Sequence, residues 1–134
     1  MALQWTEVLA TGIADIDNQH KELFKRINSL FDACQHGKGK GEVMNVLKFL
    51  EDYIETHFSA EENLQKGHSY PDYTSHKAMH KQFRKDFYEF KNKLGQTGAT
   101  LSTVIITNSL LSSWWTEHIG KVDKALGAFL RDKG

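Results

Sequence analysis

The chain has 134 residues, a length that suits one domain able to bury its own core. Hydrophobic residues make up 40% and charged residues 25%, which is typical of a soluble globular protein. Basic and acidic residues balance at 17 each, so no basic excess supports binding to nucleic acid or to anionic lipid. No apolar run approaches the length of a membrane span. We therefore expect neither a nucleic-acid nor a membrane partner.

The N-terminal residues and the single cysteine indicate the cellular compartment in which the protein is expected. The first residues, MALQWTEVLATGIADID, lack the positive and continuously apolar regions of a signal peptide. Cys34 is the only cysteine and cannot form an internal disulfide, which fits a reducing compartment. Its position in an apolar stripe indicates a small buried hydrophobic residue and not a reactive thiol. We expect a cytoplasmic protein.

The periodicity of apolar residues predicts four amphipathic helices. We expect an extended N-terminal arm over residues 1–16, anchored by Trp5, Ile13 and Ile16, with Asp17 as the cap of the first helix. Pro71 suits the first position of the third helix. Short glycine-bearing loops separate the helices, which are expected at about 18–36, 42–65, 71–94 and 101–131. The chain thus predicts one all-α domain over 1–134, an up-down-up-down four-helix bundle.

Several polar residues interrupt the apolar stripes. A buried carboxylate is costly unless it is paired or bound to a metal, and imidazoles from several helices add to that cost. The fragments HFSAE and HKAMH each place two donors four residues apart, on one helix face. A single pair of residues with this spacing is more often a surface coincidence than a metal site. A single inward histidine is usually a hydrogen-bonded core residue. Their coincidence on four inward faces favours a metal centre, with candidate ligands His20, His57, Glu61, His76, His80 and His118.

The donor types narrow the choice of metal. No thiolate takes part, and imidazole with carboxylate suits iron, zinc, manganese or copper. With Asp123 included there are five histidines and two carboxylates, too many for one tetrahedral zinc and suited to two adjacent metals. Asp123 lies five residues after His118, an awkward spacing on a regular helix. We predict a local irregularity near 119–123, eased by Gly120. His36 and His68 lie in loops and are expected to be solvated.

Four fragments, GIADIDNQHKELFKRINSL, HFSAEENL, YPDYTSHKAMHKQF and WWTEHIGKVDKAL, resemble the hemerythrin family, in particular its single-domain bacterial members. The resemblance extends from Trp5 to about Leu126. It implies a non-haem di-iron centre within the bundle. His76, His80 and His118 match the ligands of one iron, and His20 and His57 match those of a second iron with an open position. The resemblance also implies that Glu61, Asp123 and an oxo or hydroxo group bridge the two irons.

The resemblance implies reversible binding of dioxygen, for storage, delivery or sensing, and no enzymatic activity. The chain contains no Glu-x-x-His pair, the motif of oxygen-activating di-iron bundles, which agrees with oxygen carriage. Two alternatives stay open: turnover of peroxide or nitric oxide at the same centre, and sensing through a partner protein. Small anions at the open iron and a monomer or weak homo-oligomer are further expectations.

The chain departs from the family pattern at two positions near the implied oxygen pocket. Trp115 stands where a leucine is usual, and the pocket is otherwise expected to be lined by Phe58, Phe83 and Trp114. Trp115 is therefore predicted to narrow or gate the pocket, and its indole N–H needs a partner. Gln65 stands where methionine is frequent, one turn beyond Glu61. We expect Gln65 to be exposed near the end of its helix.

Overall fold

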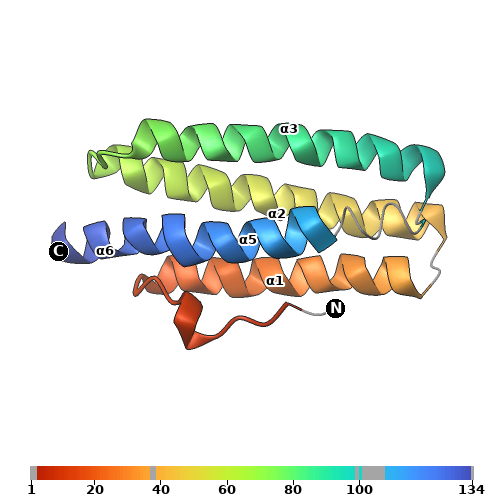
Figure 1. Ribbon diagram of the computed structural model, residues 1–134, viewed down its shortest axis with the longest axis horizontal. Helices are drawn as coiled ribbons and strands as arrows, with labels where there is room; N and C mark the ends of the chain where they lie inside the picture. The colour runs from red at the N-terminus through yellow and green to blue at the C-terminus, as the bar shows by residue number, and fades with distance from the viewer. Residues whose placement is uncertain (1–2, 37–38, 99, 101–107, 134) are drawn as a thin grey trace.

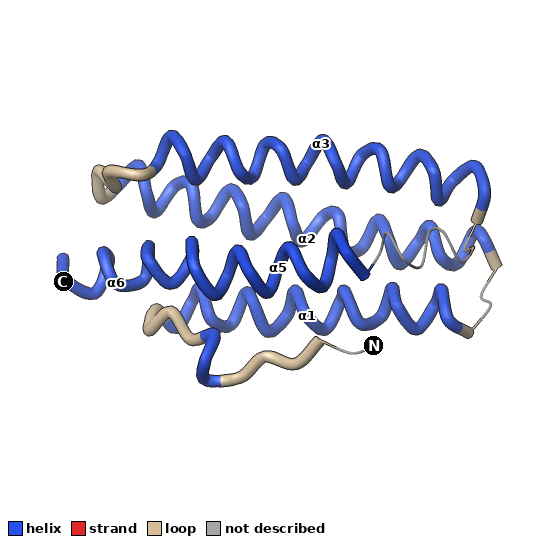
Figure 2. The backbone as a smooth tube through the Cα atoms, viewed as in Figure 1, coloured by secondary structure: helices blue, strands red, loops and turns tan. Residues whose placement is uncertain are grey.

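The computed structural model describes residues 3–36, 39–98, 100 and 108–133. Within these ranges the chain forms helices joined by short turns, and no strand is present (Figure 2). The long helices lie side by side and alternate in direction along the bundle (Figure 1). The predicted all-α, up-down-up-down four-helix bundle is confirmed.

The fourth helix of the bundle is one rod made of consecutive segments. Two of these segments, η2 and η3, are π-helical, and the predicted start of the rod at residue 101 lies outside the described residues. Elsewhere η1 is a short 3-10 turn in the N-terminal arm. In chain order the elements are η1 Glu7–Leu9, α1 Ala14–Gln35, α2 Lys40–Gly67, α3 Tyr73–Thr97, η2 Asn108–Ser113, α5 Trp114–Glu117, η3 His118–Asp123 and α6 Lys124–Lys133.

The start of α1 differs from the sequence prediction. The helix begins at Ala14 with Ile13 at the N-cap position, so Asp17 lies within the first turn and is not the cap. The Asp17 carboxylate instead accepts hydrogen bonds from the backbone N–H and hydroxyl of Thr11, both at 2.8 Å, and from the N–H of Gly12 at 3.3 Å. The Asp17 side chain thus binds the turn that precedes the helix, and α1 begins about one helical turn before the predicted start.

The turn between α2 and α3 also differs in detail. α2 continues to Gly67, and α3 begins at Tyr73. Pro71 therefore lies in the turn and not at the first helical position. Ser69 adopts a positive φ of 53° there, and the N–H of Tyr70 bonds the carbonyl of Gln65 at 2.9 Å. This close turn holds the two helices that carry most of the candidate ligands.

The N-terminal arm lies against the bundle, as Figure 1 shows. Its backbone at Leu3 exchanges two hydrogen bonds of 2.8 Å with the side-chain amide of Asn28. Trp5 is half-buried and packs on the core. At the far end of the arm, a Cβ added at Gly127 of α6 would collide with the carbonyl oxygen of Thr11. This contact requires glycine at residue 127.

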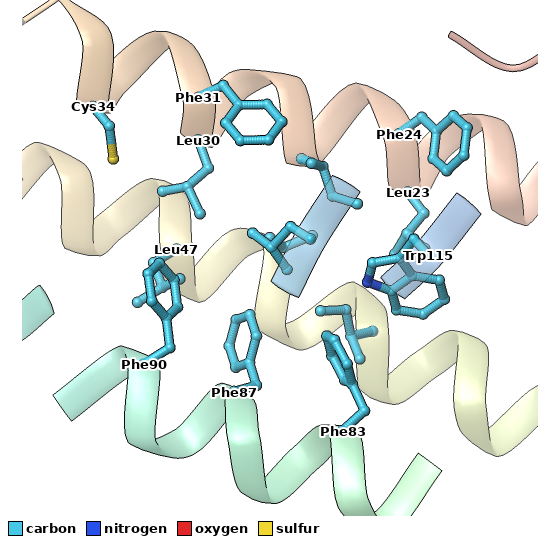
Figure 3. Close-up of a cluster of buried hydrophobic side chains, with 14 of the residues drawn as sticks. Leu23, Phe24, Leu30, Phe31, Cys34, Leu47, Phe83, Phe87, Phe90 and Trp115 are labelled. Atoms are coloured by element: carbon cyan, nitrogen blue, oxygen red, sulfur yellow. The ribbon is translucent and has the colours of Figure 1, made fainter. Parts of the chain in front are cut away.

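The interior contains two apolar clusters of different size. The larger, called here the large apolar cluster, is built from residues three and four apart on α1, α2, α3 and the last rod, including Leu47, Phe87 and Cys34 (Figure 3). Burial raises the pKa of the Cys34 thiol, which agrees with the predicted unreactive role. The smaller cluster is formed by Ile16, Tyr70 and Leu126. Among the described residues no helix is long and apolar enough to cross a membrane.

Candidate metal centre

All seven predicted ligands converge in the bundle interior. Each of the four helical rods contributes at least one, and every one of the seven is 5% exposed or less. They come from α1 (His20), α2 (His57 and Glu61), α3 (His76 and His80) and η3 (His118 and Asp123). The helix faces that carry them are the faces that carry the apolar clusters, so packing of the bundle brings the donors together.

The seven side chains divide into two overlapping groups. The first contains His76, His80 and His118 with Glu61, and is called here the three-histidine group. The second contains His20 and His57 with Glu61 and Asp123, and is called the two-histidine group. Within each group one donor atom per residue lies within 4.8 Å of all the others. This spacing is suited to one metal ion in each group.

Glu61 lies between the two groups. Its Oε1 atom is 3.1 Å from Nε2 of His76 and 3.2 Å from Nε2 of His80. Its Oε2 atom is 3.5 Å from Nε2 of His57 and 4.0 Å from Nε2 of His20. Each oxygen of this carboxylate therefore faces a different group.

Asp123 has the same arrangement from the opposite rod. Its Oδ1 atom is 3.1 Å from Nε2 of His76 and 3.3 Å from Nε2 of His118, and its Oδ2 atom is 3.0 Å from Nε2 of His20. The π-helical segment η3 spans His118–Asp123, at the position of the predicted irregularity. A π turn holds one more residue than an α turn, so residues five apart can face the same side. That is how both residues reach the centre.

The donor atoms of the centre lack ordinary partners. Within the described part of the chain, no hydrogen bond reaches Nε2 of His20, His57 or His80 or either carboxylate oxygen of Glu61 and Asp123. The Nε2 atoms of His76 and His118 face each other at 3.1 Å, where at most one proton can lie between them. Buried polar atoms of native proteins are nearly always satisfied. Imidazole nitrogens and carboxylate oxygens that converge in this way, without thiolate, fit a non-haem metal site.

Burial sets the charge of the histidines in the metal-free centre. It lowers the pKa of His57 to about 3, with a further contribution from the neighbouring His20. It also lowers the pKa of His80 to about 2, together with repulsion from His76 and His118. Both rings are therefore neutral at pH 7, which is the form that binds a metal.

The pKa values of Glu61, Asp123 and His76 reflect competition between burial, which opposes charge, and interaction with neighbouring charged groups. Burial, followed by repulsion from Asp123, raises the pKa of Glu61 well above its usual range. Burial opposes ionisation of Asp123, but the nearby charge of His118 lowers its pKa well below the usual range. For His76, burial opposes protonation, but the close carboxylates of Asp123 and Glu61 outweigh it and raise the pKa to about 9.

Three of the candidate ligand histidines have an outer partner that the sequence analysis did not identify. Nδ1 of His57 is 2.7 Å from Oε1 of Gln19, and Nδ1 of His80 is 2.9 Å from Oε2 of Glu62. Glu62 in turn lies 3.6 Å from the Arg84 guanidinium. Such partners orient metal-binding imidazoles. No spacing in the sequence reveals them, because each pair joins two different helices.

The third outer partner corrects a prediction. Gln65 is 0% exposed, and its side-chain nitrogen lies 2.9 Å from Nδ1 of His76. The expected exposure was wrong because α2 continues past residue 65 to Gly67. The signal was present in the sequence, since a residue four positions after the buried Glu61 lies on the same helix face.

Aromatic rings cover the centre unevenly. Phe58 stacks on His80 with ring centroids 3.8 Å apart, and Trp114 stacks on His118 at 4.4 Å. Trp115 is 0% exposed and lies 6.0 Å from the ring of His57, with Phe83 packed at its edge. Figure 3 shows Trp115 among Leu23, Phe24 and Phe83. The predicted need for a partner is not met, because no described residue bonds the indole N–H.

The three-histidine group lies nearer to the protein surface. A surface hollow of about 550 Å³ is lined by His118 together with Met79, Trp114 and Lys121. The two histidines of the other group are 0% exposed. His36 and His68 are exposed and bond carbonyls of their own helices, at 3.0 and 2.8 Å. Their predicted solvation is confirmed.

Comparison with known proteins agrees with this geometry. The family model of the Hemerythrin HHE cation binding domain matches residues 11–130. The chain is 36% identical to a bacteriohemerythrin of Pseudomonas aeruginosa (strain LESB58), over 90% of this chain and 76% of that one. It is 32% identical to a bacteriohemerythrin of Methylococcus capsulatus, over 97% and 98%. A solved hemerythrin with one leucine replaced by tyrosine superposes with a TM-score of 0.82 at 30% identity, covering 96% of this chain and 97% of that chain.

The family match covers more than half of the chain and includes every one of the seven converging side chains. The identity with the two bacterial relatives extends over nearly the whole sequence. The fold, the buried donor set and these similarities agree, and the chain belongs to the hemerythrin family.

Proposed function

We propose that this protein binds dioxygen reversibly at a non-haem di-iron centre. His76, His80 and His118 hold one iron, and His20 and His57 hold the other. Glu61, Asp123 and an oxo or hydroxo group bridge the two. The observation that carries the proposal is the placement of both carboxylates, each of which directs one oxygen toward each histidine group.

The two iron positions differ in their number of histidines and therefore in their capacity to bind a further ligand. The three-histidine group offers one more nitrogen than the two-histidine group, so the latter leaves a position open for an exogenous ligand. When bound, the iron pair supplies the electrons that dioxygen takes up on binding and returns on release. Small anions are expected to compete for the same open position.

The side chains near His57 determine what reaches that position. Phe58 and Trp115 are fully buried, and their rings stack at 5.5 Å beside His57. An apolar wall of this kind excludes water and protons, which slows the irreversible loss of reduced oxygen. The bulk of Trp115, where the family usually has leucine, narrows this space.

The ligand set also distinguishes carriage from oxidation. Five histidines donate no negative charge when neutral, and the low pKa values of His57 and His80 keep those rings neutral. Oxygen-activating di-iron bundles surround the metals with four carboxylates. A nitrogen-rich site stabilises high-valent iron less well, which favours release of dioxygen over its use as an oxidant.

The test is an anaerobic reconstitution with iron(II), followed by cycles of oxygen addition and removal. We expect two irons per chain and a visible absorption band that appears and disappears in each cycle. His57→Ala should lose the band, whereas the matched change His68→Ala, at an exposed histidine, should keep it. One metal per chain or an oxygen-insensitive spectrum would contradict the proposal. Continuous consumption of peroxide or nitric oxide, abolished by His57→Ala, would instead identify an enzyme.

A further inference from the structure

The inference concerns Gln65, which lies outside the seven-residue donor set. The residue sits one turn beyond Glu61 on α2, and none of its side chain reaches solvent. Its amide nitrogen is 2.9 Å from Nδ1 of His76, while its amide oxygen is buried and has no hydrogen-bond partner among the described residues. A buried amide with one unsatisfied end calls for an explanation.

The state of His76 determines which end of the amide is needed. Nδ1 of His76 faces the side-chain amide of Gln65 at 2.9 Å, and Nε2 faces His118 at 3.1 Å. A metal bound through Nε2 requires that lone pair to be free, so the one hydrogen of the neutral ring lies on Nδ1. Nδ1 then donates and needs an acceptor. The unpartnered oxygen of Gln65 becomes that acceptor when the amide turns by half a rotation.

Other side chains of similar length would hold the ring differently. A carboxylate such as Glu62, which faces His80 at 2.9 Å, can only accept when ionised. The thioether of methionine is a weak acceptor and has no hydrogen to donate. The amide oxygen of Gln65 is a full acceptor that carries no charge. This difference matters because methionine is the frequent residue at this position in the family pattern.

We propose that Gln65 is a positioning residue that holds His76 in the orientation a metal needs: its side-chain carbonyl accepts a hydrogen bond from Nδ1–H, which leaves Nε2 free to bind the metal. The inference rests on the proposed function in one respect, namely that His76 binds the metal through Nε2. It adds a residue that touches no metal and acts through the imidazole. The charge of the metal-bound ring is left unchanged, because the amide is neutral.

Metal affinity provides the first test. Iron(II) and zinc are titrated into metal-free protein against a competing chelator under anaerobic conditions. Removing an outer partner of this kind weakens metal binding by about 10- to 100-fold, and we expect this loss for Gln65→Met. Gln65→Glu keeps an acceptor and should bind within a few-fold of the wild type. The matched control is Gln82→Met, the same change at an exposed glutamine of α3, which should leave the affinity unaltered.

Proton NMR of the zinc-loaded protein provides the second test, and it does not depend on activity. The wild type should show a His76 Nδ1–H resonance that exchanges slowly with solvent. That resonance should be retained in Gln65→Glu and should broaden or disappear in Gln65→Met. Equal affinity of Gln65→Met and the wild type, or rapid exchange of Nδ1–H in the wild type, would overturn the inference. If Gln65→Met fails to fold, the wild-type resonance and the Gln65→Glu titration decide.

The two proposals fail in different ways. A wild-type protein that binds two irons but does not release oxygen would end the proposed function and leave the role of Gln65 standing. A Gln65→Met protein that binds metal as tightly as the wild type would end that role and leave oxygen binding standing.

Discussion

The large apolar cluster and the candidate metal centre are equally buried, but burial has opposite effects on their contribution to the stability of the fold. Leu47 and Leu50 are 0% exposed and gain stability from leaving water without any specific partner. Glu61 and Asp123, at 1% and 0%, lose hydration, and no described residue gives their oxygens a hydrogen bond. One region stabilises the bundle by itself, whereas the other loses hydration that a bound ion would compensate. Burial alone therefore does not tell which parts of an interior stabilise the fold.

The largest expected effect separates the two regions by a core truncation. Leu47→Ala in the large apolar cluster should lower the free energy of unfolding by about 2–5 kcal/mol, because it removes buried methyl groups and leaves a cavity. Metal content per folded chain should not change, since residue 47 lies ten positions before His57. Chemical denaturation and iron analysis measure the two quantities. Tyr88→Ala, at a residue 62% exposed, is the control and should stay within about 0.5 kcal/mol. Loss of iron in Leu47→Ala would break the comparison.

Removal of the metal should have the next largest effect. A ligand bound only by the folded state adds about 3–4 kcal/mol of stability when present at 100 to 1,000 times its dissociation constant. Chelation should therefore lower the midpoint of thermal unfolding, and added iron(II) should restore it. The same treatment of His80→Ala should lower the midpoint less, because the three-histidine group then lacks one of its nitrogen donors. A midpoint that is independent of metal would show that the centre contributes to stability without an ion.

The metal-free centre should also make stability depend on pH. His57 and His80 have folded pKa values of about 3 and 2, below the ordinary value of 6.5. The unfolded chain then binds more protons as pH falls below 6.5, so stability is complete above that pH and decreases below it. Each histidine contributes about 1.4 kcal/mol per pH unit. Urea midpoints of metal-free protein between pH 7 and 5 measure the slope, and His80→Phe should reduce it. His76, whose pKa is raised to about 9, gives its full stabilisation below pH 6.5 and loses it as pH rises toward 9.

The smallest expected effect concerns the packing of the arm. Gly127→Ala should destabilise the protein by about 1–3 kcal/mol, because the new methyl group meets the carbonyl of Thr11. Gly95→Ala is the matched change within α3, where the nearest atom, on Met44, would be 3.7 Å away. That variant should gain up to about 1 kcal/mol from higher helix propensity. Thermal unfolding of both proteins gives the signs, and equal shifts would contradict the packing argument.

The sequence alone predicted the bundle and the convergence of the donors, because both depend on positions repeated every three or four residues. Glu61 and the histidines occupy apolar stripes, so helix packing had to bring them inward. The spacing of five residues between His118 and Asp123 does not fit the helical repeat, because a regular helix could not direct both side chains to one centre. This mismatch predicted a local irregularity. The structure has a π-helical turn at that position.

Contacts between helices were harder to predict. Gln19 and Glu62 are neighbours of ligands in sequence, but each bonds a histidine on another helix, and periodicity does not describe such pairs. Helix ends were misjudged for a related reason. Asp17 resembles a cap in sequence, yet it accepts bonds from Thr11 within a turn that the pattern of apolar residues does not reveal. Gln65 was missed because a helix end was placed too early.

The π-helical turn also divides the last rod into two registers. Trp115 before the turn and His118 at its first residue point inward in one helical phase. Asp123 at its last residue and Leu126 beyond it point inward in another. One extra residue in the turn reconciles the two phases. Leu9 of the arm lies against this segment, 3.8 Å from where a Cβ on Gly120 would be, and Lys124 just beyond it bonds the carbonyl of Val8 at 3.0 Å. The N-terminal arm thus contacts the last rod at the π-helical turn and just beyond it. Through these contacts the arm supports the segment that positions Asp123.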